Sequence, residues 1–221
     1  MSSTSDRPFS IVVLISGNGS NLQALIDAIR DDGLPVQIAA VVSNKADAFG
    51  LERAQQAGIP IEVIAATAGI SRDDYDARLM ACIDSYRPDL IVLAGFMRIL
   101  SDGFVEHYLG RMINIHPSLL PKYKGLDTHR RVLEAGDKEH GATVHYVTPK
   151  LDSGPIIAQA RIPVSAGETE AELVQRIHRL EHKIYPYAVQ LIASGRLRFE
   201  QQGITLDGKP LDPGGVEIPD T

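Results

Sequence analysis

The feature that most constrains this chain is a regular alternation of short apolar runs and helix-like segments through its first half. Uninterrupted runs of Val, Ile and Leu are typical of parallel strands that are covered on both faces. Between these runs, segments with helical spacing end near a Gly or a Pro. The predicted strands are 11–16, 37–43, 59–64 and 89–95, and the predicted helices are 22–33, 48–58 and 71–88. This order predicts an open, right-handed, doubly wound α/β sheet that is mostly parallel.

The second half follows a different pattern. After a further predicted strand at 111–116, the runs 142–148 and 155–164 flank a turn-rich segment, which predicts antiparallel strands at the edge of the same sheet. A long helix is predicted from about 168 to 194, and Pro186 would end or kink it. Beyond Phe199, an Asp-Gly pair predicts a hairpin, and the last residues are expected to be loose.

Length and composition fit one soluble domain. The 221 residues predict a single domain, 1–221, with a first half at 9–108, a second half at 109–200 and a Gly/Pro-rich tail at 201–221. A lone cysteine and the lack of an apolar leader or a membrane-spanning run predict a cytoplasmic protein. The net charge of −6 argues against nucleic-acid partners, although local amides can still bind a phosphate. A monomer or a homodimer is expected.

A glycine-rich loop follows the first predicted strand and leads into a helix near Asn21. Such a loop exposes main-chain N–H groups beside the positive end of a helix, which suits a phosphate. The dinucleotide fingerprint fails because Leu22 stands at its third glycine, and no Gly-Lys-Ser/Thr follows to make a Walker A motif. A single phosphate is therefore the better fit. The alternative is a tight turn in which Ser20 or Asn21 caps the helix.

The segment from Asn114 to Pro121 places two polar side chains at the end of a strand. Asn114 and His116 are two residues apart and so share one face, while Pro117 ends the strand. An amide and an imidazolium are both donors, and together they would stabilise an oxyanion. Asp152 is the candidate carboxylate that would favour the charged imidazolium. A lone strand-end histidine is more often a structural residue, and this alternative stays open.

These motifs resemble those of the glycinamide ribonucleotide transformylases, which are folate-dependent formyltransferases. The resemblance runs from about Ile11 to Arg198 and rests on SGNGSN, LAGFMRIL, NIHPSLLP and LDSGP. It implies a Rossmann-like formyltransferase fold with a phosphoribosyl-binding first half and a catalytic, folate-binding second half. It also implies one-carbon transfer in purine biosynthesis, from 10-formyltetrahydrofolate to the amine of 5'-phosphoribosylglycinamide, with no metal.

Carried over by position, the resemblance implies three groups of site residues. The catalytic group is Asn114, His116 and Asp152. The phosphoribosylglycinamide would contact Gly19, Ser20, Asn21, His178, Arg179, Leu180 and Glu181. The folate would contact Arg72, Met97, Arg98, Ile99, Leu100, Asn114, Thr148, Pro149, Lys150, Leu151 and Asp152. Lys124 and Asp127 depart from the pattern of the family, which leaves the loop at 118–131 without a carried-over description.

Two alternative activities share parts of these motifs. Formyltetrahydrofolate hydrolases use similar blocks but transfer the formyl group to water, and they resemble this chain with a regulatory domain added at the N-terminus. A zinc hydrolase would use His178 and His182, which lie four residues apart in an H-x-x-E-H pattern. The short Gly/Pro-rich remainder of the chain offers no convincing third ligand.

Overall fold

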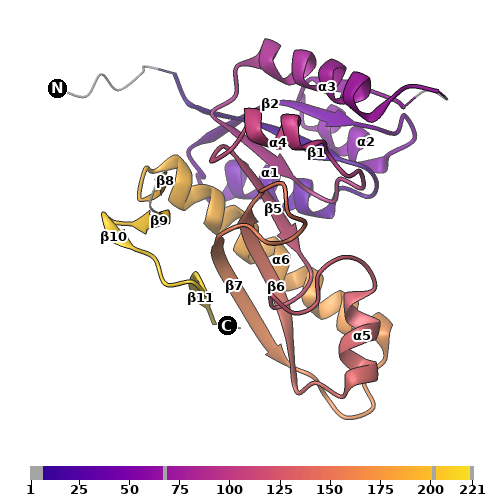
Figure 1. Ribbon diagram of the computed structural model, residues 1–221, viewed down its shortest axis with the longest axis vertical. Coiled ribbons are helices and arrows are strands. Elements are labelled where there is room, and N and C mark those ends of the chain that lie inside the picture. The colour runs from indigo at the N-terminus through magenta and orange to yellow at the C-terminus, as the bar shows by residue number, and fades with distance from the viewer. Residues whose placement is uncertain (1–6, 67–68, 201–202, 220–221) are drawn as a thin grey trace. The chain divides into compact units, whose positions relative to one another are not determined.

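The computed structural model describes residues 7–66, 69–200 and 203–219 (Figure 1). The chain divides into two compact units, Met1–Phe104 and Val105–Thr221. The six-residue helix α4 (Asp102–His107) spans the boundary between them. In the part of the chain described, no helix is both long and apolar enough to cross a lipid bilayer.

Four parallel strands form the sheet of the first unit. β1 (Phe9–Ile15) pairs with β4 (Leu90–Leu93) on one side and with β2 (Val36–Ser43) on the other, and β3 (Ile61–Val63) follows β2. Residues 11–15 of β1 are completely buried, so no polar alternation is needed along this strand. The four strands predicted for the first half are confirmed.

Three helices connect these strands: α1 (Ser20–Asp31), α2 (Phe49–Gln56) and α3 (Arg72–Tyr86). The chain runs from β1 outward to β3 and then returns to the opposite side of β1 for β4. Because such crossovers are right-handed, α3 covers the face opposite to α1 and α2. The reversal of strand order between β1 and β4 is the point where open α/β sheets bind ligands. The loops that follow these two strands are therefore the first places to look for a site.

Antiparallel pairing dominates the second unit. β5 (Met112–His116) pairs with β6 (Glu139–Tyr146), and β6 pairs with β7 (Ile156–Pro163), as predicted. The helix α5 (Thr128–Ala135) lies between β5 and β6 in the chain. A small separate sheet contains β8 (Leu197–Glu200), β9 (Gly203–Leu206) and β10 (Lys209–Pro210). The turn between β9 and β10 is made by Asp207 and Gly208, both with positive φ, which confirms the predicted hairpin.

The long helix α6 (Glu170–Ala193) packs against β6 and β7. Thr169 begins it with a capping box to Glu172. Pro186 was expected to end or kink this helix; it lies inside α6 and does not end it. The proline cannot donate a main-chain hydrogen bond, but buried side chains on both sides of it, such as Tyr185 and Val189, anchor the helix in the core.

The end of the chain is more ordered than the sequence suggests. β11 (Val216–Ile218) pairs in parallel with β7, although the last residues were expected to be loose. Gly215 allows this pairing, because it has a φ of 72° and a Cβ there would lie 2.8 Å from the main chain of Ile157. Residues 220–221 lie outside the described part of the chain. The single-domain organisation remains a prediction.

Candidate active site

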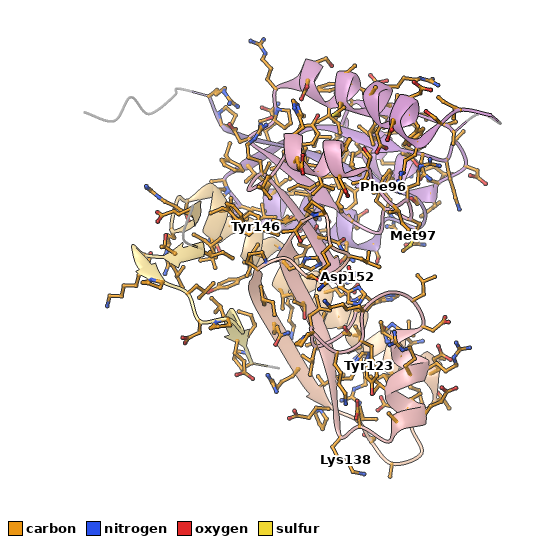
Figure 2. The ribbon with its side chains drawn as sticks, viewed as in Figure 1. Phe96, Met97, Tyr123, Lys138, Tyr146 and Asp152 are labelled. Atoms are coloured by element: carbon orange, nitrogen blue, oxygen red, sulfur yellow. The ribbon has the colours of Figure 1, made fainter. Side chains whose placement is uncertain are left out.

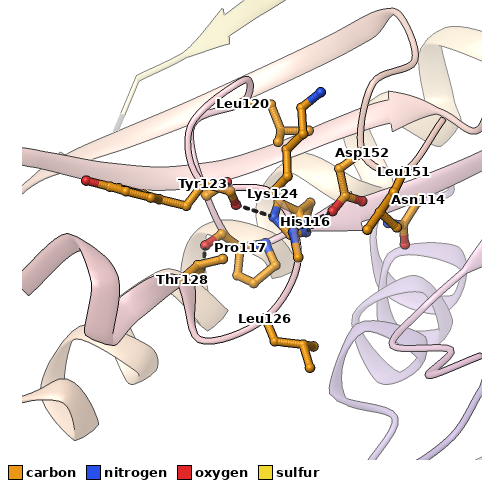
Figure 3. A network of polar contacts seen from close by, with 12 residues as sticks. Asn114, His116, Pro117, Leu120, Tyr123, Lys124, Leu126, Thr128, Leu151 and Asp152 are labelled. Carbon is orange, nitrogen blue, oxygen red and sulfur yellow. Dashed lines mark hydrogen bonds and ion pairs between the residues drawn. The ribbon is translucent and has the colours of Figure 1, made fainter.

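The side chains of His116 and Asp152 come together in the second unit. His116 ends β5, and Asp152 lies in the turn between β6 and β7 (Figure 3). Nδ1 of His116 is 3.6 Å from Oδ2 of Asp152, and the two residues are only 6% and 9% exposed. Both polar groups are therefore held largely out of water at this contact. The expected proximity of the histidine and the carboxylate is therefore observed.

Asn114 joins this pair through His145, a histidine that was not predicted to belong to the site. On the antiparallel ladder Asn114 lies opposite His145, whose Nε2 is 3.5 Å from Nδ2 of Asn114 and 3.9 Å from Oδ1 of Asp152. The other ring nitrogen of His145 lies 2.9 Å from the carbonyl oxygen of Tyr146, so Nδ1 carries the proton and donates it. Burial lowers the pKa of His145. Its Nε2 is thus an acceptor for the Asn114 amide.

The strand pattern could have indicated His145. Thr143 and His145 are two residues apart on β6, as Asn114 and His116 are on β5. The ladder pairs His116 with Thr143 and Asn114 with His145. The signal in the sequence is a pair of polar residues with the same spacing on each of two adjacent strands, and only the pair on β5 was predicted to belong to the site.

The conformation of Asp152 is unusual for a non-glycine residue. Its φ is 44°, in the left-handed region, where a β-carbon is disfavoured. Such conformations cluster at functional sites. Gly154 follows two residues later. A Cβ at that position would lie 1.8 Å from the carbonyl oxygen of Tyr146, so the close approach requires a glycine. The turn thus presents the carboxylate toward β5 while its own main chain is held tightly against the end of β6.

The loop at 118–127 closes over the same cluster. The carbonyl oxygen of Tyr123 lies 2.8 Å from Nε2 of His116, and the Gly125 amide donates to Oδ2 of Asp152 at 2.9 Å. The Lys124 ammonium, which departs from the family pattern, donates to the Ser153 hydroxyl. Each ring nitrogen of His116 therefore faces an oxygen atom: Nδ1 faces Oδ2 of Asp152, and Nε2 faces the carbonyl oxygen of Tyr123.

The glycine-rich loop of the first unit has an open helix start. Gly19 is the N-cap of α1 and supplies no side-chain cap, so the capping role considered for Ser20 or Asn21 is not observed. A Cβ on Gly19 would lie 2.7 Å from Cα of Gly50, so both glycines are needed for this close approach. Arg53 donates to the carbonyl oxygen of Asn18 at 2.9 Å. Gly50 and Arg53 were not identified from the sequence.

The predicted folate residues lie on loops and a helix end in both units. In the first unit, Arg72 begins α3, and residues 97–100 follow β4. Met97 and Ile99 are 68% and 70% exposed, large values for apolar side chains, and Figure 2 labels Met97 in this segment. In the second unit, Thr148, Pro149, Lys150 and Leu151 lie in the connection between β6 and β7, and Leu151 is exposed.

The four substrate residues predicted on α6 differ in their exposure. His178 and Arg179 are exposed, whereas Leu180 and Glu181 are buried. The rings of His178 and His182 are stacked with their centroids 6.4 Å apart. Within residues 7–66, 69–200 and 203–219, no three His, Cys, Asp or Glu side chains are grouped as metal ligands. The zinc-hydrolase alternative therefore has no ligand set in the described chain.

Comparison with known proteins agrees with this fold. The model of the formyl transferase family matches residues 9–189, and the chain belongs to that family. It is 57% identical to the phosphoribosylglycinamide formyltransferase of Escherichia coli (strain K12), over 93% of this chain and 97% of the relative. A solved phosphoribosylglycinamide formyltransferase from Coxiella burnetii is 56% identical, with a TM-score of 0.92 over 96% of this chain and 100% of that chain.

A formyltetrahydrofolate deformylase is a more distant neighbour. The solved deformylase from Pseudomonas putida KT2440 is 27% identical, with a TM-score of 0.82 over 92% of this chain and 72% of that chain. It shares the fold but far less of the sequence than the formyltransferases do.

Proposed function

We propose that this enzyme is a phosphoribosylglycinamide formyltransferase that transfers the formyl group of 10-formyltetrahydrofolate to the amine of 5'-phosphoribosylglycinamide. The products are formylglycinamide ribonucleotide and tetrahydrofolate, in purine biosynthesis. The observation that carries the proposal is the buried cluster in which His116 lies 3.6 Å from Asp152, with Asn114 on the same strand. This is the donor set that acyl transfer requires.

The proposed roles follow from the proton positions. The substrate amine forms a new C–N bond to the formyl carbon, and the bond from that carbon to the folate nitrogen then breaks. Negative charge develops on the formyl oxygen, and the Asn114 amide and the His116 imidazolium donate hydrogen bonds to it. Asp152 keeps the imidazole charged and oriented. The proton that leaves the attacking nitrogen reaches the departing folate nitrogen through His116 or a water.

His145 would act on Asn114 rather than on the substrate. Its Nε2 accepts from the amide, so the amide nitrogen rather than the amide oxygen faces the cluster. Because an amide that turned by 180° would present an acceptor to the oxyanion, this fixed orientation matters for catalysis. His145 is thus a positioning residue in this proposal.

The binding residues extend the proposal to both substrates. The open start of α1, with Gly19, Ser20 and Asn21, would hold the phosphate, and residues 178–181 of α6 would contact the rest of that substrate. The folate would lie against residues 97–100 and 148–152 and reach Arg72 with its glutamate tail. The apolar Met97, Ile99 and Leu151, exposed in this structure, suit the flat faces of a pterin.

The setting of the enzyme is proposed on composition. A cytoplasmic location is supported by the single cysteine, and independence from nucleic acid by the net charge of −6. Either a monomer or a homodimer is compatible with the proposed catalytic roles, since the catalytic cluster lies within one unit of one chain.

The test is the release of tetrahydrofolate from 10-formyltetrahydrofolate by the purified enzyme, with and without phosphoribosylglycinamide. Release that depends on the amine, with one formylated product per tetrahydrofolate, is expected. Equal release without the amine would instead establish a hydrolase.

A further inference from the structure

The connection at 95–101, which links β4 to α4, has no regular secondary structure but is tied at both ends. Near its start, the Met97 amide donates to the Ser16 hydroxyl at 2.7 Å. At its end, the Ser101 amide donates to Oδ2 of Asp76 at 2.6 Å. Two side chains from distant parts of the first unit therefore fix where this segment begins and ends.

Both ties are made by buried side chains. Ser16 is 4% exposed at the end of β1, and its hydroxyl donates to Oδ1 of Asn44 at 2.6 Å, which turns its lone pairs toward Met97. Asp76 is 1% exposed, inside α3. Oδ1 of Asp76 has no hydrogen-bond partner among the described residues. An incompletely paired buried carboxylate weakens a fold, so stability alone does not explain Asp76.

Tyr75 supports the middle of the connection. The Arg98 guanidinium lies 3.9 Å from the centroid of the Tyr75 ring, which is fully buried. Burial raises the pKa of Tyr75, so the ring stays neutral beneath the cation. With Arg98 drawn inward, Met97 and Ile99 on either side of it are turned outward and are 68% and 70% exposed.

Between the hydrogen bonds at Met97 and Ser101, the main-chain groups are available to bind a ligand. In the part of the chain described, the main-chain groups of Arg98, Ile99 and Leu100 make no hydrogen bond. A pterin ring presents amide and amino groups at its edge and apolar faces above and below. Free main-chain groups flanked by exposed apolar side chains match both features.

We propose that Asp76 and Tyr75 are positioning residues that preorganise residues 97–100 to bind the ring of the folate. Asp76 sets the end of the segment through Ser101, and Tyr75 holds Arg98 inward so that its neighbours face the ligand. This inference rests on the proposed function, because the folate is the ligand it assigns. Neither residue touches the formyl group, so their loss acts on folate affinity rather than on the chemical step.

The test compares folate and amine substrates in matched variants. Asp76→Ala removes the acceptor for Ser101, whereas Asp76→Asn retains an oxygen that can accept the same hydrogen bond. We expect Asp76→Ala to raise the KM for 10-formyltetrahydrofolate, and the Kd of tetrahydrofolate measured by calorimetry, at least tenfold. The KM for phosphoribosylglycinamide stays within twofold, and Asp76→Asn restores most of the folate affinity. The exposed Asp84 of the same helix supplies the control, Asp84→Asn.

Substitutions of Tyr75 provide an independent test of the proposal. Tyr75→Leu removes the ring beneath Arg98 and raises the folate Kd severalfold, and Tyr75→Phe, which keeps the ring, raises it less. Unchanged folate affinity in both Asp76→Ala and Tyr75→Leu, or an equal loss of affinity for the two substrates, would overturn the proposal. If Asp76→Ala does not fold, the Tyr75→Leu result decides. Calorimetry needs no turnover, so a wild type that binds tetrahydrofolate but transfers no formyl group would defeat the proposed function alone.

Discussion

The carbonyl oxygen of Tyr123 lies 2.8 Å from Nε2 of His116, the nitrogen on the side of the ring away from Asp152. A main-chain oxygen of the 118–127 loop thus occupies a position where His116 donates a hydrogen bond. The negatively charged formyl oxygen proposed above needs a donor of the same kind. The loop must therefore withdraw from His116 if Nε2 is the nitrogen that serves the reaction.

Lys124 is expected to hold this loop in place. Its ammonium group donates to Ser153, the neighbour of Asp152. Lys124→Ala removes this link, and Ser153→Ala removes it from the other side. We expect several-fold faster amide hydrogen exchange across residues 118–127 in either variant, because local opening becomes easier. Exchange as slow as in the wild type in both variants would show that the Gly125 and Tyr123 contacts suffice.

The second prediction concerns the orientation of the Asn114 amide. His145→Phe fills the same space but offers no acceptor to Nδ2 of Asn114, which lies 3.5 Å from the histidine. Loss of one such hydrogen bond is worth about 1 kcal/mol. We therefore expect kcat to fall roughly five- to tenfold, since each 1.36 kcal/mol corresponds to a factor of about ten. Steady-state kinetics should show both KM values nearly unchanged.

The conservative variant separates this role from general damage to the core. His145→Gln retains an oxygen acceptor and should recover part of the lost kcat. The exposed His107 provides a control in His107→Gln. Full turnover in His145→Phe would contradict the positioning role of His145.

The third prediction concerns the phosphate loop. Gly19→Ala introduces a Cβ 2.7 Å from Cα of Gly50, at a residue with a φ of 73°. The loop must move away from α2, and an Ala in this conformation costs about 1 kcal/mol as well. We expect the KM for phosphoribosylglycinamide to rise at least tenfold, while the KM for the folate changes less than twofold.

Gly103→Ala is the matched control for this substitution. No atom lies within 4 Å of the Cβ it would add, and its φ is outside the left-handed region. If Gly19→Ala bound phosphoribosylglycinamide as tightly as this control, the loop would have no part in phosphate binding.

The fourth prediction is a pH-dependent stability. Burial lowers the pKa of both His129 and His140 from 6.5 to about 4, and Nε2 of His140 lies 3.0 Å from Nδ1 of His129. Between these pH values the unfolded chain binds protons that the folded chain does not. The free energy of unfolding is therefore highest above about pH 6.5 and falls as the pH drops toward about 4.

Urea unfolding at several pH values across this window measures the effect. His140→Gln should flatten the dependence, because one of the rings whose pKa burial lowers is gone. A free energy of unfolding that stays constant on acidification of the wild type would refute the assignment.

The parallel sheet could be predicted from the sequence because its strands are apolar throughout. β1 and β4 are buried along nearly their whole length, so their runs of Val, Ile and Leu mark them directly. α5 and β11 were not predicted, because neither is marked by such an apolar run. β11 is three residues long and follows a Gly/Pro-rich stretch, and its pairing with β7 depends on contacts distant in the chain.

Only part of the catalytic cluster could be predicted from the sequence. Asn114 and His116 share a strand, so their common face follows from the spacing alone. The approach of Asp152 depends on the register between β5 and β6 and on the left-handed turn at Asp152 itself, neither of which is local in sequence. The tautomer of His145 depends on a main-chain oxygen, which no residue pattern reveals.

A kinetic double-mutant cycle on His116→Ala and Asp152→Asn tests whether these two residues act as one catalytic unit. Both residues act on one developing charge in this account, so each single variant should lower kcat more than tenfold. The double variant should be little worse than the poorer single variant, because residues that act as a unit are not additive. Near-normal turnover in the single variants, or losses that simply multiply, would show that His116 and Asp152 do not act as one unit.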